Sequence, residues 1–330
     1  MKLKSVKRIW EQGAHNAFTD LIAFQGALFC VFREGTAHVS PDGALRILRS
    51  TDLGDTWQSV ALICSDEADL RDGKLIEYQG ELLLLGGGTL HDKSGLQSHL
   101  WRSLDGVVWS DALKIGDKGY WLWRLTEHQN VLYGVGYRAG PDGDTRLYKS
   151  DDGVQFETWL KVFNNQGYVN ESAIVFHQGS GFCLLRRDPV WGPEFVGLLG
   201  RSQAPFIDWQ WQELDKRIGG PVMFMYQSRL LAVVRLYENQ VRTALVEIYP
   251  DTGVVQELLT LPSKGDTSYA GVVIEGNELW VSYYSSHEFA DEQIDMPSLI
   301  DDGSATAKPK TMIYFAKIQL NVVDGVTACK

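Results

Sequence analysis

The sequence has few cysteines, no long apolar run and fewer basic than acidic residues, and each shortage excludes a class of protein. Its cysteines lie far apart and form no CxxC or Cys/His pattern, so no metal site is predicted from them. Lys and Arg number 31 against 42 Asp and Glu, which gives a formal net charge of -11. This balance argues against nucleic acid or an anionic membrane surface as the main partner.

Membrane, export and cofactor signals are also missing. Nowhere do 18 apolar residues follow one another, so no membrane-spanning helix is predicted. The basic N-terminal segment has neither an apolar stretch nor a cleavage site, so a cytoplasmic protein is the default expectation. The glycine run 86–88 follows a predicted strand but does not open a helix, and we expect no nucleotide cofactor.

What the chain does contain is a repeat. Each unit has an apolar strand, a tight turn with Gly, Asn or Ser, and a second apolar strand, followed by a further strand and usually by a Trp-bearing fourth segment. This layout, at a spacing of about 50 residues, predicts an all-β, six-bladed β-propeller with four-stranded antiparallel blades. The paired strands lie at 21–34, 74–88, 122–138, 172–188, 221–237 and 270–288.

The two ends of the chain supply the closure that a ring requires. The last repeat runs short after Leu320, while the chain begins with a strand-like segment at 5–10. We therefore expect residues 1–330 to form a single propeller domain whose N-terminal strand completes the sixth blade. The polar segment 289–308 is expected to be a long surface loop.

One motif of the repeat resembles a known family. Segment 50–57, STDLGDTW, looks like the Asp-box (SxDxGxTW, or BNR repeat) of sialidases and related propellers, and weaker copies occupy 103–109 and 150–156. Its Asp accepts backbone N–H bonds, its Gly takes an unusual backbone conformation and its aromatic residue anchors the turn. We expect these residues to be structural, and whether such loops hold calcium stays open. Because the Asp-box also occurs in propellers that are not sialidases, function needs a separate argument.

Topology places a candidate site on the face opposite the Asp-box turns. In an up-and-down blade, the start of the innermost strand and the end of the second strand lie at the same end. Several arginines that meet at one rim repel one another unless an anion or carboxylates neutralise them, so this rim predicts either an anion site or ion pairs within the protein. The polar residues expected there include Arg33, His38, Arg71, Asp72, Arg124, Arg186, Arg187, Arg235 and His287.

The sialidase resemblance implies three arginines that clamp the carboxylate of an acidic sugar. Arg33, in Phe-Arg-Glu, resembles the first arginine of the family, although Glu and Gly replace the Ile-Pro that usually follows. Arg187 is in the place of the second, and Arg186 competes with it because strand alternation directs only one of the two inward. Arg235 is in the place of the third by its position in the repeat.

The same resemblance implies a nucleophile, its base and an acid. Tyr269, in Thr-Ser-Tyr-Ala, resembles the nucleophile, Glu171, in Asn-Glu-Ser, the residue that takes its proton, and Asp42 the acid/base residue. A tyrosine avoids the repulsion that a carboxylate nucleophile would meet from the carboxylate of the substrate. Asp42 also fits an ordinary Pro-Asp-Gly turn. The late Glu of sialidases has no match.

Arg71, Asp72 and His38 are polar residues that the sialidase pattern does not require, and they indicate a different substrate or a different acid. Our first hypothesis is a sialidase-like exo-glycoside hydrolase that acts on a terminal acidic sugar of a glycan. A second is a polysaccharide lyase or glycosidase that uses His38 or His287 against a uronic acid. A third is a carbohydrate-binding propeller without catalysis.

Overall fold

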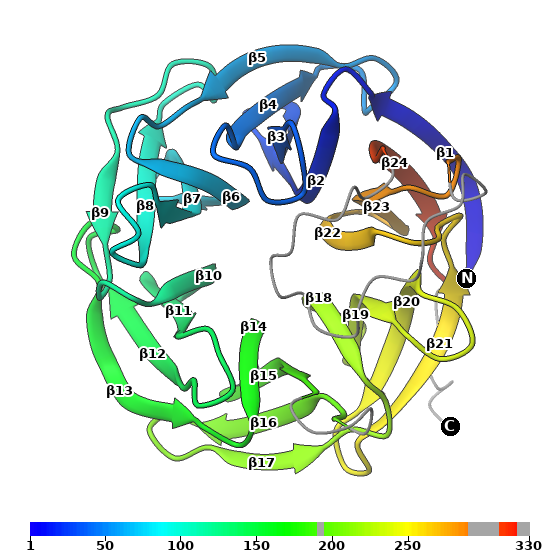
Figure 1. Ribbon diagram of the computed structural model, residues 1–330. Helices are drawn as coiled ribbons and strands as arrows, with labels where there is room; N and C mark the ends of the chain where they lie inside the picture. The colour runs from blue at the N-terminus through cyan, green and yellow to red at the C-terminus, as the bar shows by residue number, and fades with distance from the viewer. Residues whose placement is uncertain (190–194, 290–309, 322–330) are drawn as a thin grey trace.

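In the computed structural model, residues 1–189, 195–289 and 310–321 are described, and within these ranges the regular elements are the strands β1 to β24. They form six four-stranded antiparallel sheets arranged in a ring (Figure 1). The predicted fold, an all-β six-bladed propeller, is confirmed. Nearly all of the expected loop at 289–308 lies outside the described residues. The described ranges hold no helix of the length and apolarity that a membrane span needs.

The strands of each blade run from the centre of the ring outward in chain order, and the sixth blade takes its outer strand from the N-terminus. Listed from the inside, the blades are β2 (His15–Phe24), β3 (Ala27–Gly35), β4 (Ala44–Ser50), β5 (Gln58–Ile63); β6 (Ala68–Tyr78), β7 (Glu81–Leu90), β8 (Leu96–Ser103), β9 (Leu113–Ile115); β10 (Trp121–His128), β11 (Val131–Tyr137), β12 (Thr145–Ser150), β13 (Glu157–Asn164); β14 (Tyr168–His177), β15 (Ser180–Asp188), β16 (Leu198–Gln203), β17 (Gln210–Glu213); β18 (Ile218–Tyr226), β19 (Arg229–Leu236), β20 (Arg242–Tyr249), β21 (Val254–Thr260); β22 (Thr267–Glu275), β23 (Glu278–Ser285), β24 (Met312–Gln319), β1 (Lys2–Trp10).

Strand β1 joins the two ends of the ring. It pairs antiparallel with β24, from Lys2 opposite Gln319 to Trp10 opposite Ile313. The first and last described strands therefore share one blade, which fixes blade 1 beside blade 6 (Figure 1).

The innermost strand of every blade contains a β-bulge at the same level. In β2, pairing with β3 passes from Ala17–Arg33 to Asp20–Val31, so β2 advances by three residues while β3 advances by two. The same break occurs in the other five inner strands. A bulge of this kind bends the strand and re-aims its side chains. The residue pairs inside the breaks are 18–19, 72–73, 123–124, 170–171, 220–221 and 269–270.

The turn after β4 is held together by its own side chains. Asp52 accepts hydrogen bonds from the Thr56 backbone N–H at 2.9 Å and from the Thr56 hydroxyl at 2.6 Å. Gly54 has φ +86°, and a Cβ there would lie 2.3 Å from a ring carbon of Phe315, so no other residue fits without displacement. The turn follows Ser50, which pairs with Leu28 at the end of blade 1 away from the bulge.

Replacing Asp52 should therefore weaken the fold without touching the centre of the ring. We expect Asp52→Ala to lower the midpoint of thermal unfolding, because the N–H and hydroxyl of Thr56 lose their acceptor. Leu53→Ala is the matched control, since the Leu53 side chain in the same turn is 62% exposed. Equal melting temperatures for the two variants would contradict a structural role for Asp52.

Candidate functional site

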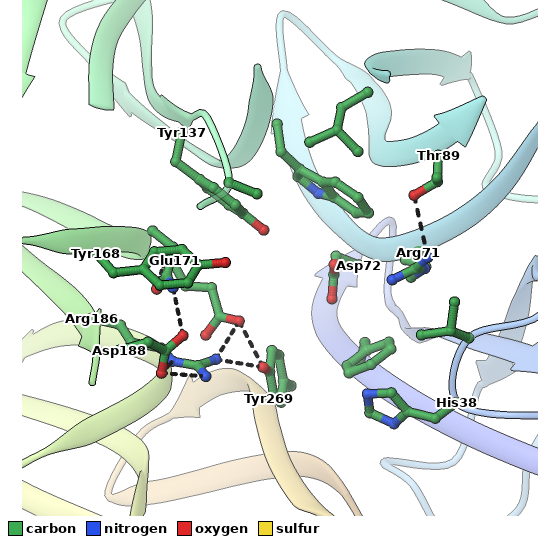
Figure 2. Close-up of a pocket in the computed structure, with 16 residues that line it drawn as sticks. His38, Arg71, Asp72, Thr89, Tyr137, Tyr168, Glu171, Arg186, Asp188 and Tyr269 are labelled. Carbon is green, nitrogen blue, oxygen red and sulfur yellow. Dashed lines mark hydrogen bonds and ion pairs between the residues drawn. The ribbon is translucent and has the colours of Figure 1, made fainter. Parts of the chain in front are cut away.

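A cavity of about 190 Å³ lies among the innermost strands of the ring. Its walls come from blades 1, 2, 3, 4 and 6, mainly from their first and second strands, together with neighbouring loops (Figure 2). Four of its residues, Phe18, Asp72, Asn170 and Tyr269, are the first residues of their bulges, and Glu171 is the second residue of the bulge in β14. The bulges thus turn residues that are distant in the sequence toward one space.

Tyr269, Glu171 and Arg186 form a closed triangle of hydrogen bonds on one wall (Figure 2). The Tyr269 hydroxyl lies 2.6 Å from Glu171 Oε1, and Arg186 Nη1 donates to that oxygen at 2.7 Å and to the Tyr269 oxygen at 2.8 Å. The second oxygen of Glu171 accepts the Gly220 backbone N–H at 2.8 Å. All three side chains are buried, so these contacts fix the phenol against the carboxylate.

Gly220 makes this approach possible from blade 5. It is the first bulge residue of β18 and has φ +52°. A Cβ at this position would lie 2.9 Å from Cγ of the Tyr269 ring. The absence of a side chain lets the backbone come close enough to bond Glu171 while the Tyr269 ring packs above it.

The electrostatics around Tyr269 keep its proton in place at rest. Burial raises the pKa of Tyr269 well above its usual value, and the charge of Glu171 raises it further, while Arg186 and Arg235 act in the opposite direction. The phenol is therefore neutral at neutral pH and needs a base to become a nucleophile. Glu171 is at the distance and in the position to be that base.

Arg186 is balanced by a second acid. Its Nε and Nη2 donate to Asp188 Oδ1 at 3.1 and 2.8 Å, and Arg217 approaches the same oxygen at 3.1 Å. Asn170 donates to the other Asp188 oxygen at 2.7 Å. Burial alone would raise the pKa of Asp188, but the adjacent Arg186 brings it below the usual value.

The opposite wall carries Asp72, Arg71 and His38 (Figure 2). Asp72 is 7% exposed, and its Oδ1 is buried without a hydrogen-bond partner among the described residues. Burial raises the pKa of Asp72 to about 7; Lys74 works against this rise and Glu171 adds to it. Arg71 is held by Asp69 at 2.8 Å and donates to Thr89 at 3.2 Å.

His38 belongs to a buried group with His15 and Asp266. The imidazoles lie 2.8 Å and 3.2 Å from the same Asp266 oxygen, and the three possible ligand atoms lie within 4.8 Å of one another. Tyr284 donates to the other Asp266 oxygen at 2.7 Å, and Arg235 lies 3.5 Å from it. With a guanidinium already beside this carboxylate, a hydrogen-bonded cluster describes the group better than a cation site.

An aromatic wall completes the cavity. Trp121 and Tyr137 are stacked with ring centroids 6.4 Å apart, and Tyr168 lines the same space. Tyr168 begins β14 and Phe18 lies in an apolar strand, where aromatic residues indicate packing as readily as a site. Trp121 could be found by its place at the start of an inner strand.

Arg33, which was predicted to bind substrate, is buried in β3. Arg33 is 0% exposed and is not part of the cavity wall. Its guanidinium donates to Asp69, to the carbonyl oxygens of Ala37 and Ser40, and to the Ser40 hydroxyl. It holds the loop after β3 against blade 2, and each of its three nitrogens already donates a hydrogen bond within the protein.

Arg187, which was also predicted to bind substrate, does not line the cavity, whereas its competitor Arg186 does. Arg187 donates to the Val196 carbonyl oxygen at 2.8 Å and to Glu213 at 2.6 Å, on the outer side of blade 4. Alternation along β15 directs only one of two neighbouring side chains inward, and the register of the strand selects Arg186.

Asp42 does not reach the cavity either. It is exposed and accepts the Thr36 backbone N–H and hydroxyl at 3.0 Å, which closes the loop after β3. Its slight burial would raise its pKa, but hydrogen bonds from Ser40 and Thr36 lower it below the usual value. A carboxylate that prefers its ionised form in a turn is unsuited to donate a proton at neutral pH.

Three further predicted residues lie outside the cavity wall. Arg124 reaches below it, to Asp20 Oδ1 at 3.0 Å and to the carbonyl oxygen of Ala270 at 3.2 Å. Arg235 donates to the Thr267 carbonyl oxygen, with its guanidinium carbon 5.1 Å from the centre of the Tyr269 ring. His287 lies against Tyr314, with ring centroids 4.8 Å apart, and contacts Ser285. Of the predicted residues, Tyr269, Glu171, Arg71, Asp72 and His38 do line the cavity.

Comparison with known proteins adds the fold family. No family model and no curated protein sequence matches the chain. Among solved structures, a protein of unknown function from Dyadobacter fermentans has a TM-score of 0.77 at 17% identity, covering 97% of this chain and 99% of its own. The phage phi92 endosialidase has a TM-score of 0.73 at 9% identity, covering 100% of this chain and 71% of its own. The Penicillium chrysogenum α-L-arabinanase, solved with arabinobiose, has a TM-score of 0.71 at 14% identity, covering 97% and 99%.

The chain has a sialidase-like propeller fold. At these identities the likeness concerns the fold, and the chemistry has to be argued from the cavity of this chain.

The ion pairs of Arg186 predict a large stability effect. Arg186→Met leaves Glu171 and Asp188 buried without their main counter-charge, so we expect a loss of about 3–5 kcal/mol in the free energy of unfolding. Arg201→Met is the control, because Arg201 pairs with Asp251, whose side chain is 92% exposed, and should cost roughly 0–1 kcal/mol. Urea denaturation of both variants measures the difference. Similar losses would contradict the network as described.

Proposed function

We propose that this protein is a retaining glycoside hydrolase that removes a terminal sugar, with Tyr269 as the nucleophile and Glu171 as its base. The observation that carries the proposal is the 2.6 Å hydrogen bond between these two buried side chains, both of which line the cavity. A buried phenol paired with a carboxylate resembles an activated nucleophile more than a packing residue, because both side chains of the pair also line the cavity.

The first step forms a glycosyl-tyrosine. The Tyr269 oxygen attacks the anomeric carbon while its proton passes to Glu171, and the bond from that carbon to the leaving oxygen breaks. The leaving oxygen takes a proton from an acid on the opposite wall. Arg186, which donates to both reacting side chains, stabilises the charge that moves from Glu171 to the phenol oxygen.

The second step restores the protein. Water attacks the anomeric carbon and gives its proton to the side chain that acted as the acid. The bond from the carbon to Tyr269 breaks, and the phenol oxygen recovers the proton held by Glu171. The sum of the two steps is hydrolysis with retained configuration.

The size of the cavity favours a terminal sugar. At about 190 Å³, it is smaller than the roughly 300–1,000 Å³ of pockets that hold drug-sized ligands. One sugar ring can stack on Trp121 and Tyr137. Our narrower proposal is an acidic sugar, because the guanidinium of Arg71 lies on the wall.

Tyr269→Phe tests the nucleophile. We expect kcat on a hydrolysed aryl glycoside to fall by at least about 10³-fold while the sugar still binds, because only the attacking oxygen is removed. Tyr249→Phe, which removes an exposed hydroxyl outside the cavity, is the control and should match the wild-type protein. The substrates are 4-methylumbelliferyl glycosides of sialic acid, a uronic acid and arabinofuranose.

Each outcome of that panel separates the hypotheses. Turnover that survives in Tyr269→Phe would overturn the proposed nucleophile. Turnover of the neutral arabinofuranoside alone would leave the nucleophile in place and overturn the acidic sugar. Binding without turnover of any glycoside would favour a carbohydrate-binding propeller.

One contact supports the alternative of a lyase or a histidine-dependent glycosidase. His38 lines the cavity and lies 2.8 Å from Asp266, so it has the carboxylate partner of a general base. If this reading holds, His38→Gln abolishes cleavage of a uronic acid glycan while Tyr269→Phe retains it. An unsaturated sugar product would identify the lyase.

A further inference from the structure

The reaction needs a side chain that gives a proton to the leaving group. Asp42, which the sequence suggested for this role, lies in an exposed turn away from the cavity. We propose that Asp72 is the acid/base residue of the reaction, an assignment that rests on the proposed function. It stands on the wall opposite Tyr269 and Glu171, with the cavity between them (Figure 2).

The backbone directs Asp72 into the cavity. It is the first residue of the bulge in β6, where pairing with β7 passes from Arg71–Gly87 to Lys74–Leu85. Its φ of +55° is one that residues other than Gly rarely adopt. Such strain persists where the surroundings hold the residue in place, and it gathers at functional sites. Tyr269, in the corresponding position of blade 6, has φ +50°.

The surroundings of Asp72 favour a proton on its carboxyl group. Its Oδ1 is buried and accepts no hydrogen bond within the described part of the chain. An ionised carboxylate loses its hydration in such a place and gains no donor in return, whereas the acid form loses much less. Asp52, in contrast, accepts three hydrogen bonds in its turn and is stabilised as the anion.

Charged groups from several elements face Asp72. Lys74 and Arg71, on its own strand, lower the pKa of Asp72, as does His38 from the loop after β3. Glu171 of β14 raises the pKa of Asp72. The charge of Asp72 in turn raises the pKa of Tyr137 in β11. Burial outweighs these effects and brings the pKa to about 7. The residue is therefore an acid below pH 7 and becomes a base after it has given up its proton.

The role conserves protons over the cycle. In the first step Asp72 gives its proton to the leaving oxygen as the bond from that oxygen to the anomeric carbon breaks. In the second step the Asp72 carboxylate takes a proton from the attacking water, which bonds to the same carbon. Tyr269 and Glu171 exchange their own proton separately, so no further reactant is needed.

The test compares Asp72→Asn with Asp42→Asn. Both substrates carry the sugar that the wild-type protein hydrolyses, and they differ in the leaving group. Dinitrophenolate leaves without being protonated, whereas the methoxy group must be protonated in order to leave. We expect Asp72→Asn to lose about 10²–10⁴-fold in kcat on the methyl glycoside and far less on the dinitrophenyl glycoside. Asp42→Asn should match the wild-type protein on both.

Two further readouts separate an acid/base role from a structural one. For the wild-type protein, the rate on the methyl glycoside should fall as pH rises through about 7, the pKa of Asp72, and this limb should be absent in Asp72→Asn. In Asp72→Ala, azide should restore turnover of the dinitrophenyl glycoside and yield a glycosyl azide, because an anion replaces the water that Asp72 activates. Circular dichroism checks that each variant is folded.

The failures are distinguishable. If Tyr269→Phe is inactive but Asp72→Asn loses equally on both substrates and keeps the pH limb, the assignment of Asp72 is wrong and the proposed function stands. A loss confined to Asp42→Asn would return the role to Asp42. If the wild-type protein cleaves no glycoside, the proposed function and this assignment fall together.

Discussion

One extra residue in the innermost strand of each blade is the constraint on which the site depends. In a regular strand, alternation would send neighbouring side chains to opposite faces of the blade. The bulge breaks that alternation at the same level in all six blades. Asp72, Glu171 and Tyr269, which belong to three blades, can therefore line one cavity. The ring supplies the position, and the bulge supplies the direction of each side chain.

Charge balance explains which arginines serve the site and which serve the fold. A buried guanidinium is costly unless carboxylates or carbonyls answer it. Arg33 donates its hydrogen bonds to carbonyl oxygens of one loop and to Asp69, so it stabilises the fold. Arg186 is answered by Glu171 and Asp188 and still contacts the reacting phenol. Ion pairing therefore gives Arg33 of blade 1 a structural role and places Arg186 of blade 4 in contact with the reacting group.

The sequence predicted the ring and half of the site, and the division has a physical cause. Apolar periodicity and turn residues repeat in every blade, so the fold and the closing strand could be predicted. Tyr269 and Glu171 were found because their neighbours resemble a family pattern. The choice between Arg186 and Arg187 could not be made, because one residue of register decides it. Asp72 could be placed on the rim but not recognised as an acid, since that depends on burial and on an unpartnered oxygen.

The central claim is that the oxygen of Tyr269 forms a bond to the sugar. A fluorinated glycosyl fluoride of the hydrolysed sugar slows the second step and traps the intermediate, and peptide mass spectrometry then locates the label. We expect one sugar on the peptide that contains Tyr269, and no label in Tyr269→Phe. A label on Glu171 or Asp72 in the wild-type protein would contradict it.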